Sequence, residues 1–139
     1  MKLPTDLKIL ETIYDRYYST FEAFDNNTQP TRTAKVYVPI DVDEIGKALQ
    51  VDGDIVFGRL YYHLNSKYGY SNSDGSKVIF FALEVGAGEH KDKHCIQFPL
   101  MASVLSELKV EQNKFKLNTV LSIVSLVVSV AAVIISILV

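Results

Sequence analysis

The sequence of 139 residues is poor in cysteine, has a small net charge and carries no charged side chain after Lys116. Because Cys95 is alone, no disulfide can form within the chain, and a reducing compartment is expected. The net charge of −2 excludes a general affinity for polyanions, since any basic face would have to be local. The first six residues lack the apolar run of a signal peptide, so the N-terminal part is expected to stay where it is synthesised.

Motifs for catalysis and for metal binding are also missing. No glycine-rich phosphate loop precedes a helical pattern, and no carboxylate pair has a spacing that implies a cleft. A zinc site is not expected from His90, His94 and Cys95. Adjacent strand residues point to opposite faces, and a fourth ligand is not evident. A lone cysteine in a strand is more often a small core residue than a nucleophile. We therefore expect no enzyme, no metal and no cofactor.

What is present is a long uncharged run at residues 117–139, in which 15 of 23 residues are Leu, Ile or Val. A helix of this length measures about 34 Å, against roughly 30 Å for the hydrocarbon core of a bilayer. The 116 residues before it are too few to cover a helix that is apolar all round. The run predicts a transmembrane helix at the end of the chain, which is a tail anchor.

The basic residues next to this run predict its orientation. Lys109, Lys114 and Lys116 stand immediately before it. Cytoplasmic flanks of membrane helices are enriched in Lys and Arg, so the N-terminal domain is expected in the cytoplasm and the lipid bilayer is the first expected partner.

Small residues recur inside the predicted span at spacings of three or four. They are Ser122, Ser125, Ser129, Ala132 and Ser136. Such spacing puts them on one stripe of a helix, where backbones of two helices can approach closely. We expect the chain to form a homo-oligomer through this stripe; the alternative is that the serines are merely scattered.

The first part of the soluble domain shows a helix, a short strand and a second helix. Thr5 is a good N-cap for an amphipathic helix of about 20 residues, whose predicted inner face is Leu7, Leu10, Ile13, Tyr14, Tyr17, Phe21 and Phe24. Residues 25–32 read as a polar loop. Residues 36–40 predict a strand that Pro39 confines to an edge or a strand end. Asp41 caps the next helix, and Glu44 is spaced to complete a capping box.

The second part predicts a helix and a hairpin. After a tight turn at residues 51–54, a helix is expected at residues 55–68, with an inner face of Phe57, Leu60, Tyr61, Leu64 and Tyr68. Residues 69–76 read as a loop, residues 77–85 as a strand, residues 86–93 as a hairpin connection and residues 94–98 as the returning strand. Pro99 then opens a helix that leads into the predicted span, continuous from about Leu100.

This order of elements resembles the winged helix-turn-helix family over residues 5–108. The expected fold class is therefore α+β, with a winged helix-like domain at residues 1–98, a connecting helix at 99–116 and the anchor at 117–139. The resemblance implies that residues 55–68 are the recognition helix and residues 77–98 the wing.

The resemblance also implies a contact surface, on the exposed face of the recognition helix and at the wing. Its candidate residues are Arg59, Tyr62, His63, Ser66, Lys67, Lys91 and Lys93. Two partners remain open. Duplex DNA would use Arg59 on a guanine edge and Lys67 on phosphate, but residues 35–67 hold four basic and five acidic residues. A protein partner would use exposed aromatic residues such as Tyr62 and Tyr70. We expect a membrane-tethered regulatory or interaction protein that binds a protein partner, with DNA as the alternative.

Overall fold

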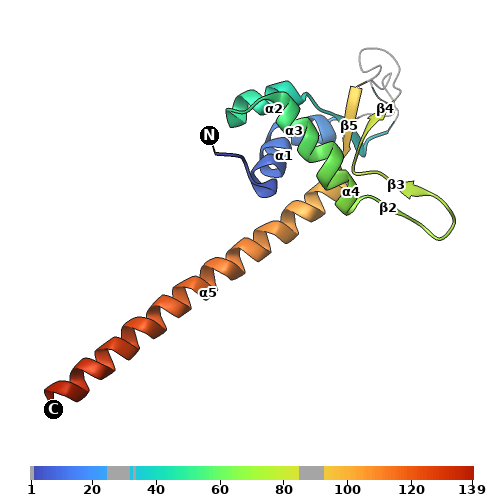
Figure 1. Ribbon diagram of the computed structural model, residues 1–139. Helices are drawn as coiled ribbons and strands as arrows, with labels where there is room; N and C mark the ends of the chain where they lie inside the picture. Colours follow the sequence, from blue (N-terminus) through green and yellow to red (C-terminus); the bar gives the residue numbers. More distant parts are fainter. Residues whose placement is uncertain (1, 25–31, 33, 85–92) are drawn as a thin grey trace. The chain divides into compact units, whose positions relative to one another are not determined.

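The computed structural model describes residues 2–24, 32, 34–84 and 93–139 and has an α+β architecture (Figure 1). The chain divides into two compact units, Met1–Leu105 and Ser106–Val139. The first unit is a mixed domain of helices and short strands, and the second is helical throughout. The α+β fold class expected from the sequence is confirmed at this level.

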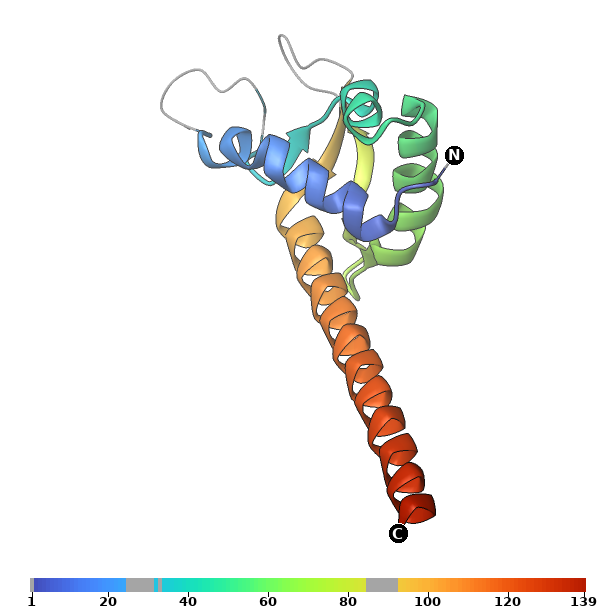
Figure 2. The same ribbon diagram turned by 90° about the vertical axis from the view of Figure 1, so that its left-hand side faces the viewer.

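Helix α1 (Asp6–Glu22) begins where the sequence places it. The Thr5 hydroxyl oxygen accepts a hydrogen bond from the Lys8 N–H at 3.1 Å, which satisfies one of the free amides of the first turn. Its buried residues are Ile9, Leu10 and Ile13. Leu10 and Ile13 belong to the predicted inner face, whereas Ile9 does not. Figure 2 shows α1 lying across the strands of the sheet.

Three strands form the main sheet in the order β1-β5-β4. They are β1 (Tyr37–Pro39), β4 (Phe81–Glu84) and β5 (Lys93–Gln97), and both pairings are antiparallel. Ile96 at the centre is paired with Val38 on one side and with Phe81 on the other, and all three side chains are fully buried. Because β1 lies at the edge of the sheet, the edge position predicted from Pro39 is confirmed.

Helix α2 (Val42–Leu49) packs closely against the start of the next helix. Gly46 makes this approach possible, because a Cβ atom there would lie 2.7 Å from the carbonyl oxygen of Val51. Gln50 ends α2 in a left-handed conformation with φ of 58°. The chain then turns directly into α3.

The predicted helix at residues 55–68 is present but starts earlier and is not uniform. It comprises α3 (Gly53–Gly58), the π-helical segment η1 (Arg59–Leu64) and α4 (Asn65–Tyr68). The buried residues Val56, Leu60 and Leu64 line one side. Tyr61, predicted to face inward, is 43% exposed, so that prediction is wrong. The wider i→i+5 turn of a π-helix shifts the face on which each later residue lies, which helical periodicity does not anticipate.

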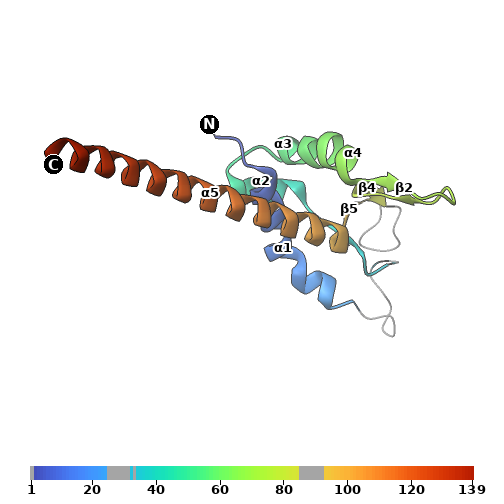
Figure 3. The same cartoon turned by 90° about the horizontal axis from the view of Figure 1, so that it is seen from below.

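The predicted strand at residues 77–85 is split into two. Residues Lys77–Val78 form β3, which pairs with β2 (Tyr70–Ser71) inside the predicted loop, and only after Phe80 does β4 join the main sheet. Figure 3 shows the β2–β3 hairpin extending beyond the end of α4. Residues 86–92 of the predicted hairpin connection lie outside the described part, as does residue 85 at the end of the predicted strand, and Lys93 begins β5 rather than ending the connection.

Arg32 is a buried residue that links two segments of the domain, which the sequence pattern did not predict. It falls in the predicted polar loop, yet it is only 7% exposed. Its guanidinium donates hydrogen bonds to the carbonyl oxygens of Thr20, Phe21, Ala34 and Lys35. Because a buried cation is costly unless it is hydrogen-bonded, these contacts hold the end of α1 next to the approach to β1.

Helix α5 (Phe98–Leu138) runs without a break for 41 residues, which confirms the predicted continuous helix. Within the first unit it buries Phe98, Met101, Val104 and Leu105. From Ser106 onward no residue is buried. By its length and composition the helix can cross a membrane.

Candidate interaction surface

Exposed apolar side chains of the domain gather in a groove between the helix at residues 53–68 and strand β4. We call this the aromatic groove, a hollow of about 520 Å³ lined by Phe57, Tyr61, Tyr62, Asn65, Ile79, Phe81, Ala82, Leu83 and His94. Tyr62 is 74% exposed and Leu83 is 52% exposed. None of the lining side chains carries a permanent charge. An exposed apolar hollow of this kind is typical of a surface that another molecule covers.

The rings of the groove support one another. Phe57 stacks on Tyr61 with ring centroids 5.3 Å apart, and Tyr61 meets Tyr62 edge-on at 5.1 Å. His94 packs edge-on against Phe57 at 4.9 Å and stacks on Phe81 at 5.2 Å. Such pairs add to the energy of burial and restrict ring motion. The floor of the groove is therefore preformed.

Asn65 joins the two walls of the groove. Its side-chain oxygen accepts hydrogen bonds from the backbone N–H groups of Phe80 and Phe81, each at 3.1 Å. A single amide oxygen of the helix thus holds the start of β4. This contact explains why the predicted strand at residues 77–85 bends after Val78.

The structure separates the predicted contact residues into groups. Tyr62, Ser66 and Lys67 are exposed on the helix, although only Tyr62 lines the groove. Lys93 is exposed on β5 and pairs in register with Glu84. Lys91 lies outside the described residues.

Arg59 and His63 point toward the start of α1 instead of standing free. The Arg59 Nε atom lies 3.1 Å from the Asp6 Oδ1 atom, and the Arg59 Nη2 group donates to the Pro4 carbonyl oxygen at 3.2 Å. The His63 Nε2 atom lies 3.5 Å from the Asp6 Oδ2 atom. The basic stripe of Arg59, His63 and Lys67 is therefore divided, because its first two members face an acidic partner.

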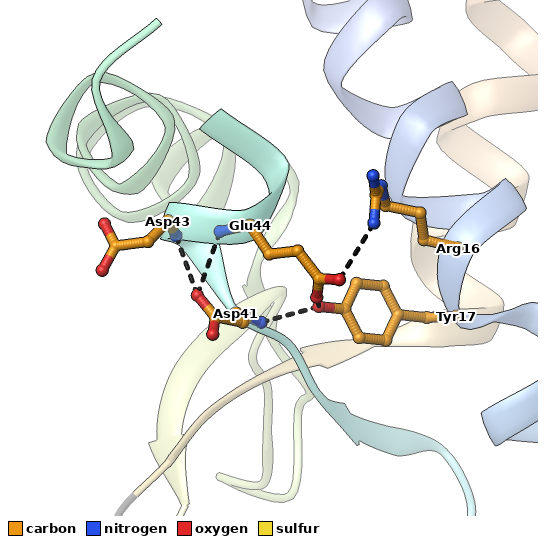
Figure 4. A network of polar contacts seen from close by, with 5 residues as sticks. All are labelled: Arg16, Tyr17, Asp41, Asp43 and Glu44. Atoms are coloured by element: carbon orange, nitrogen blue, oxygen red, sulfur yellow. Dashed lines mark hydrogen bonds and ion pairs between the residues drawn. The ribbon is translucent and has the colours of Figure 1, made fainter. Parts of the chain in front are cut away.

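A second polar cluster surrounds the start of α2, and Figure 4 shows its five residues. The Asp41 carboxylate accepts hydrogen bonds from the N–H groups of Asp43 and Glu44 at 2.9 and 3.1 Å, as an N-cap should. Glu44 does not return to the Asp41 N–H, so the predicted capping box is wrong. The Tyr17 hydroxyl takes that place: it accepts from the Asp41 N–H at 2.9 Å and donates to Glu44 at 3.3 Å.

Arg16 completes this cluster by donating to the other Glu44 oxygen at 3.0 Å. Burial raises the pKa of Tyr17 above its ordinary value of 10.0, the hydrogen bond from the Asp41 N–H opposes this, and the Glu44 and Asp41 charges raise it further. The Glu44 carboxylate is thus already bound within the domain. The cluster ties α1 to α2, and Tyr17, Asp41 and Glu44 also line a hollow of about 560 Å³.

Among the described residues, no group of three or more His, Cys, Asp or Glu side chains is placed to hold a metal ion. Of the weak metal set considered from the sequence, Cys95 is buried on β5 opposite Ala82, His94 lies opposite Leu83, and His90 lies outside the described residues.

The small-residue stripe of α5 has hydroxyls that bond within their own helix. The Ser122 hydroxyl donates to the Asn118 carbonyl at 2.9 Å, and the Ser129 hydroxyl donates to the Ser125 carbonyl at 2.8 Å. These two serines therefore need no partner for their polar atoms in lipid. The small side chains of the stripe would allow the backbone of a second helix to approach closely.

Sequence reasoning found Tyr62 but missed most of the groove. The alternation of Phe81 and Leu83 was a usable signal, because residues two apart in a strand lie on one face. Asn65 left no such signal, since its role depends on a strand 15 residues away. The chain matches no family model, no curated protein and no solved structure, so its function rests on the geometry of this surface.

Proposed function

We propose that this chain is a single-span membrane protein whose winged helix-like domain binds a protein partner through the aromatic groove. The order of α1, β1, α2, the helix at residues 53–68 and the β4–β5 pair supports the winged helix resemblance. In that resemblance the groove lies between the recognition helix and the wing. A domain with this design recruits or positions its partner at a membrane surface.

The membrane part of the proposal is supported by the exposed second unit. The 18-residue apolar window of α5 has no buried residue, so nothing in the described chain shields it from water. Lipid is a solvent in which such a surface is stable. Lys109, Lys114 and Lys116 at its start favour the cytoplasmic side for the domain.

The observation that carries the choice of a protein partner is the exposure of Tyr62 beside Leu83 in an uncharged groove. Aromatic residues are enriched at the centres of protein interfaces, where charged residues are depleted. DNA binding draws its affinity from cations that neutralise phosphates. Here Arg59 is paired with Asp6, and Asp52 and Asp54 are exposed at the start of the same helix.

The test is photo-crosslinking of the full chain in its own cells. A photoreactive phenylalanine replaces Tyr62 in one variant and Tyr18, which is exposed on α1 outside the groove, in the matched control. We expect a discrete adduct with one protein from position 62 and none from position 18. The adduct should disappear when Leu83→Asp is added, because a charge then enters the apolar wall. Equal adducts at both positions would contradict the proposal.

DNA binding is measured in parallel on the full chain in nanodiscs of neutral lipid. We expect no retardation of duplex DNA at low salt. Binding that weakens steeply as salt is added, and that is lost in Lys67→Ala but kept in Tyr62→Ser, would replace the protein partner with DNA.

A further inference from the structure

Among the described residues, strand β4 has an outer edge on which no other strand pairs. Its inner edge pairs with β5, and no other described strand lies on its outer side. The Gln97 N–H of β5 donates to the Phe80 carbonyl at 2.9 Å, so the backbone groups of the next residue, Phe81, face the outer side. In an antiparallel pair the direction of the N–H and C=O groups alternates from residue to residue. The N–H and C=O of Leu83, two residues on, therefore also face outward.

The Asn65 side chain accepts a hydrogen bond from the outer edge of β4, as the backbone of a neighbouring strand would. Its side-chain oxygen accepts from the outward Phe81 N–H, where a neighbouring strand would place a backbone carbonyl, and also from the Phe80 N–H just before the strand. Beyond Asn65 the edge is open toward Leu83, whose side chain is half exposed at the rim of the groove. An exposed strand edge next to an apolar hollow is a template for one more strand.

We propose that the partner contributes an extended segment that adds to the outer edge of β4 as a fourth strand, with apolar side chains at alternate positions filling the aromatic groove. This rests on the proposed function, because it assigns the conformation and chemistry of the segment that occupies the same groove. Backbone hydrogen bonds to Leu83 hold the segment, and side chains two residues apart lie against Tyr62 and Leu83.

A second copy of the chain fits this surface less well. A two-fold contact brings the same patch of both copies together, so the patch must be complementary to itself. The groove is hollow on each copy, and two hollows cannot fill each other. A single extended strand, which lies about 4.8 Å from its neighbour, can enter between β4 and the helix.

The probe for the test is a decapeptide selected from a random displayed library on the full chain in nanodiscs, with the Tyr62→Ser chain used to remove peptides that bind elsewhere. The selected peptide is then made in two forms, N-methylated at its odd or at its even residues. A strand bonded along one edge uses the amides of only one set. We expect one form to bind at least about tenfold more weakly and the other to bind like the parent.

The matched variants of the protein are Leu83→Pro and Leu83→Ala. Proline removes the outward N–H without taking a hydrogen bond from the β4–β5 pair, and proline is tolerated on strand edges facing solvent. Alanine keeps the N–H and shortens the side chain. We expect Leu83→Pro to weaken the peptide by about tenfold and Leu83→Ala to weaken it less. Circular dichroism of both variants checks that the domain is folded.

The outcomes separate the two proposals. If the two methylated forms bind equally, or if Leu83→Pro binds like the wild type, the added strand is wrong, while sensitivity to Tyr62→Ser leaves the protein-binding groove standing. If the library yields no peptide that distinguishes wild type from Tyr62→Ser, both proposals fail. If β4 edges cross-link between copies and exclude the peptide, the occupant is a second copy and the inference is overturned.

Discussion

The two units of this chain use the same kinds of apolar side chain in opposite ways. In the domain, Leu60 and Phe81 are fully buried against other residues of the chain, whereas in the second unit Leu126 is 65% exposed. Covering an apolar side chain stabilises by about 1.5–3 kcal/mol wherever the cover comes from. The domain therefore buries its apolar side chains against one another. The apolar side chains of the second unit must be buried by their surroundings, which our proposal identifies as lipid.

The largest expected effect concerns the membrane insertion of α5. Val124→Arg together with Val128→Arg places two cations near the middle of the apolar run, at a cost of about 6 kcal/mol for membrane insertion. This is of the same order as the total gain from the Leu, Ile and Val residues. We expect the variant to leave the membrane fraction on carbonate extraction, while Val124→Leu with Val128→Leu stays. Retention of the arginine variant would mean that protein, not lipid, covers the helix.

The second largest effect concerns the free energy of unfolding of the domain. Leu60→Ala removes a fully buried side chain and should lower the free energy of unfolding by about 3 kcal/mol, whereas Tyr62→Ala should change it by less than about 0.5 kcal/mol. Tyrosine fluorescence during urea unfolding of the full chain in detergent reports this, because all eight tyrosines lie before residue 71. Membrane extraction should be unchanged in both. A comparable loss in Tyr62→Ala would show that the groove is part of the core.

A smaller effect tests the tie between α1 and α2. Tyr17→Phe deprives the Asp41 N–H of its acceptor and should lower the free energy of unfolding by about 1 kcal/mol at neutral pH. Because the folded pKa of Tyr17 is raised, its ionisation opposes folding. The wild-type advantage should therefore be complete below pH 10 and fall as the pH rises through the folded pKa. A difference between the two proteins that stays constant above pH 10 would contradict this.

The smallest expected effect concerns the contact of α5 with a second copy of the chain. We expect the chain to self-associate through the small-residue stripe. Ser125→Leu with Ser129→Leu should weaken energy transfer between labelled chains in vesicles by a few-fold, since membrane helix contacts average about 0.6 kcal/mol each. Val127→Leu with Val130→Leu, off the stripe, is the matched control. Equal transfer in both variants would leave the serines without a role in association.

Local patterns predicted the parts of the fold that depend on near neighbours. Thr5 was predicted as an N-cap from its residue type, and its hydroxyl oxygen accepts from the N–H three residues on. Pro39 marked an edge strand because it lacks an amide proton, and the uncharged run at residues 117–139 indicated an exposed helix through composition alone. Tyr62 was correctly predicted to be exposed, although the same helical spacing failed for its neighbour Tyr61 in the π-helical segment.

The features that the sequence did not reveal all depend on residues distant in the chain. The acceptor of the Asp41 N–H is Tyr17, 24 residues away, so a correct cap signal led to a wrong capping box. The Arg59 guanidinium donates to the carbonyl of Pro4, 55 residues away in the chain. The Asn65 side-chain oxygen accepts from the N–H of Phe80, 15 residues away, at the start of β4.

By itself, then, the sequence determined where α1 and α2 begin, which strand lies at an edge and which segment forms an exposed apolar helix. Each of these is decided by side chains within a turn or two of one another. Only the tertiary structure decided which basic residues are paired, where the helix at residues 53–68 widens and where the aromatic groove forms. The pairing depends on the start of α1 lying against that helix, and the groove depends on β4 lying against it. Contacts between distant segments leave no periodic trace in a single chain.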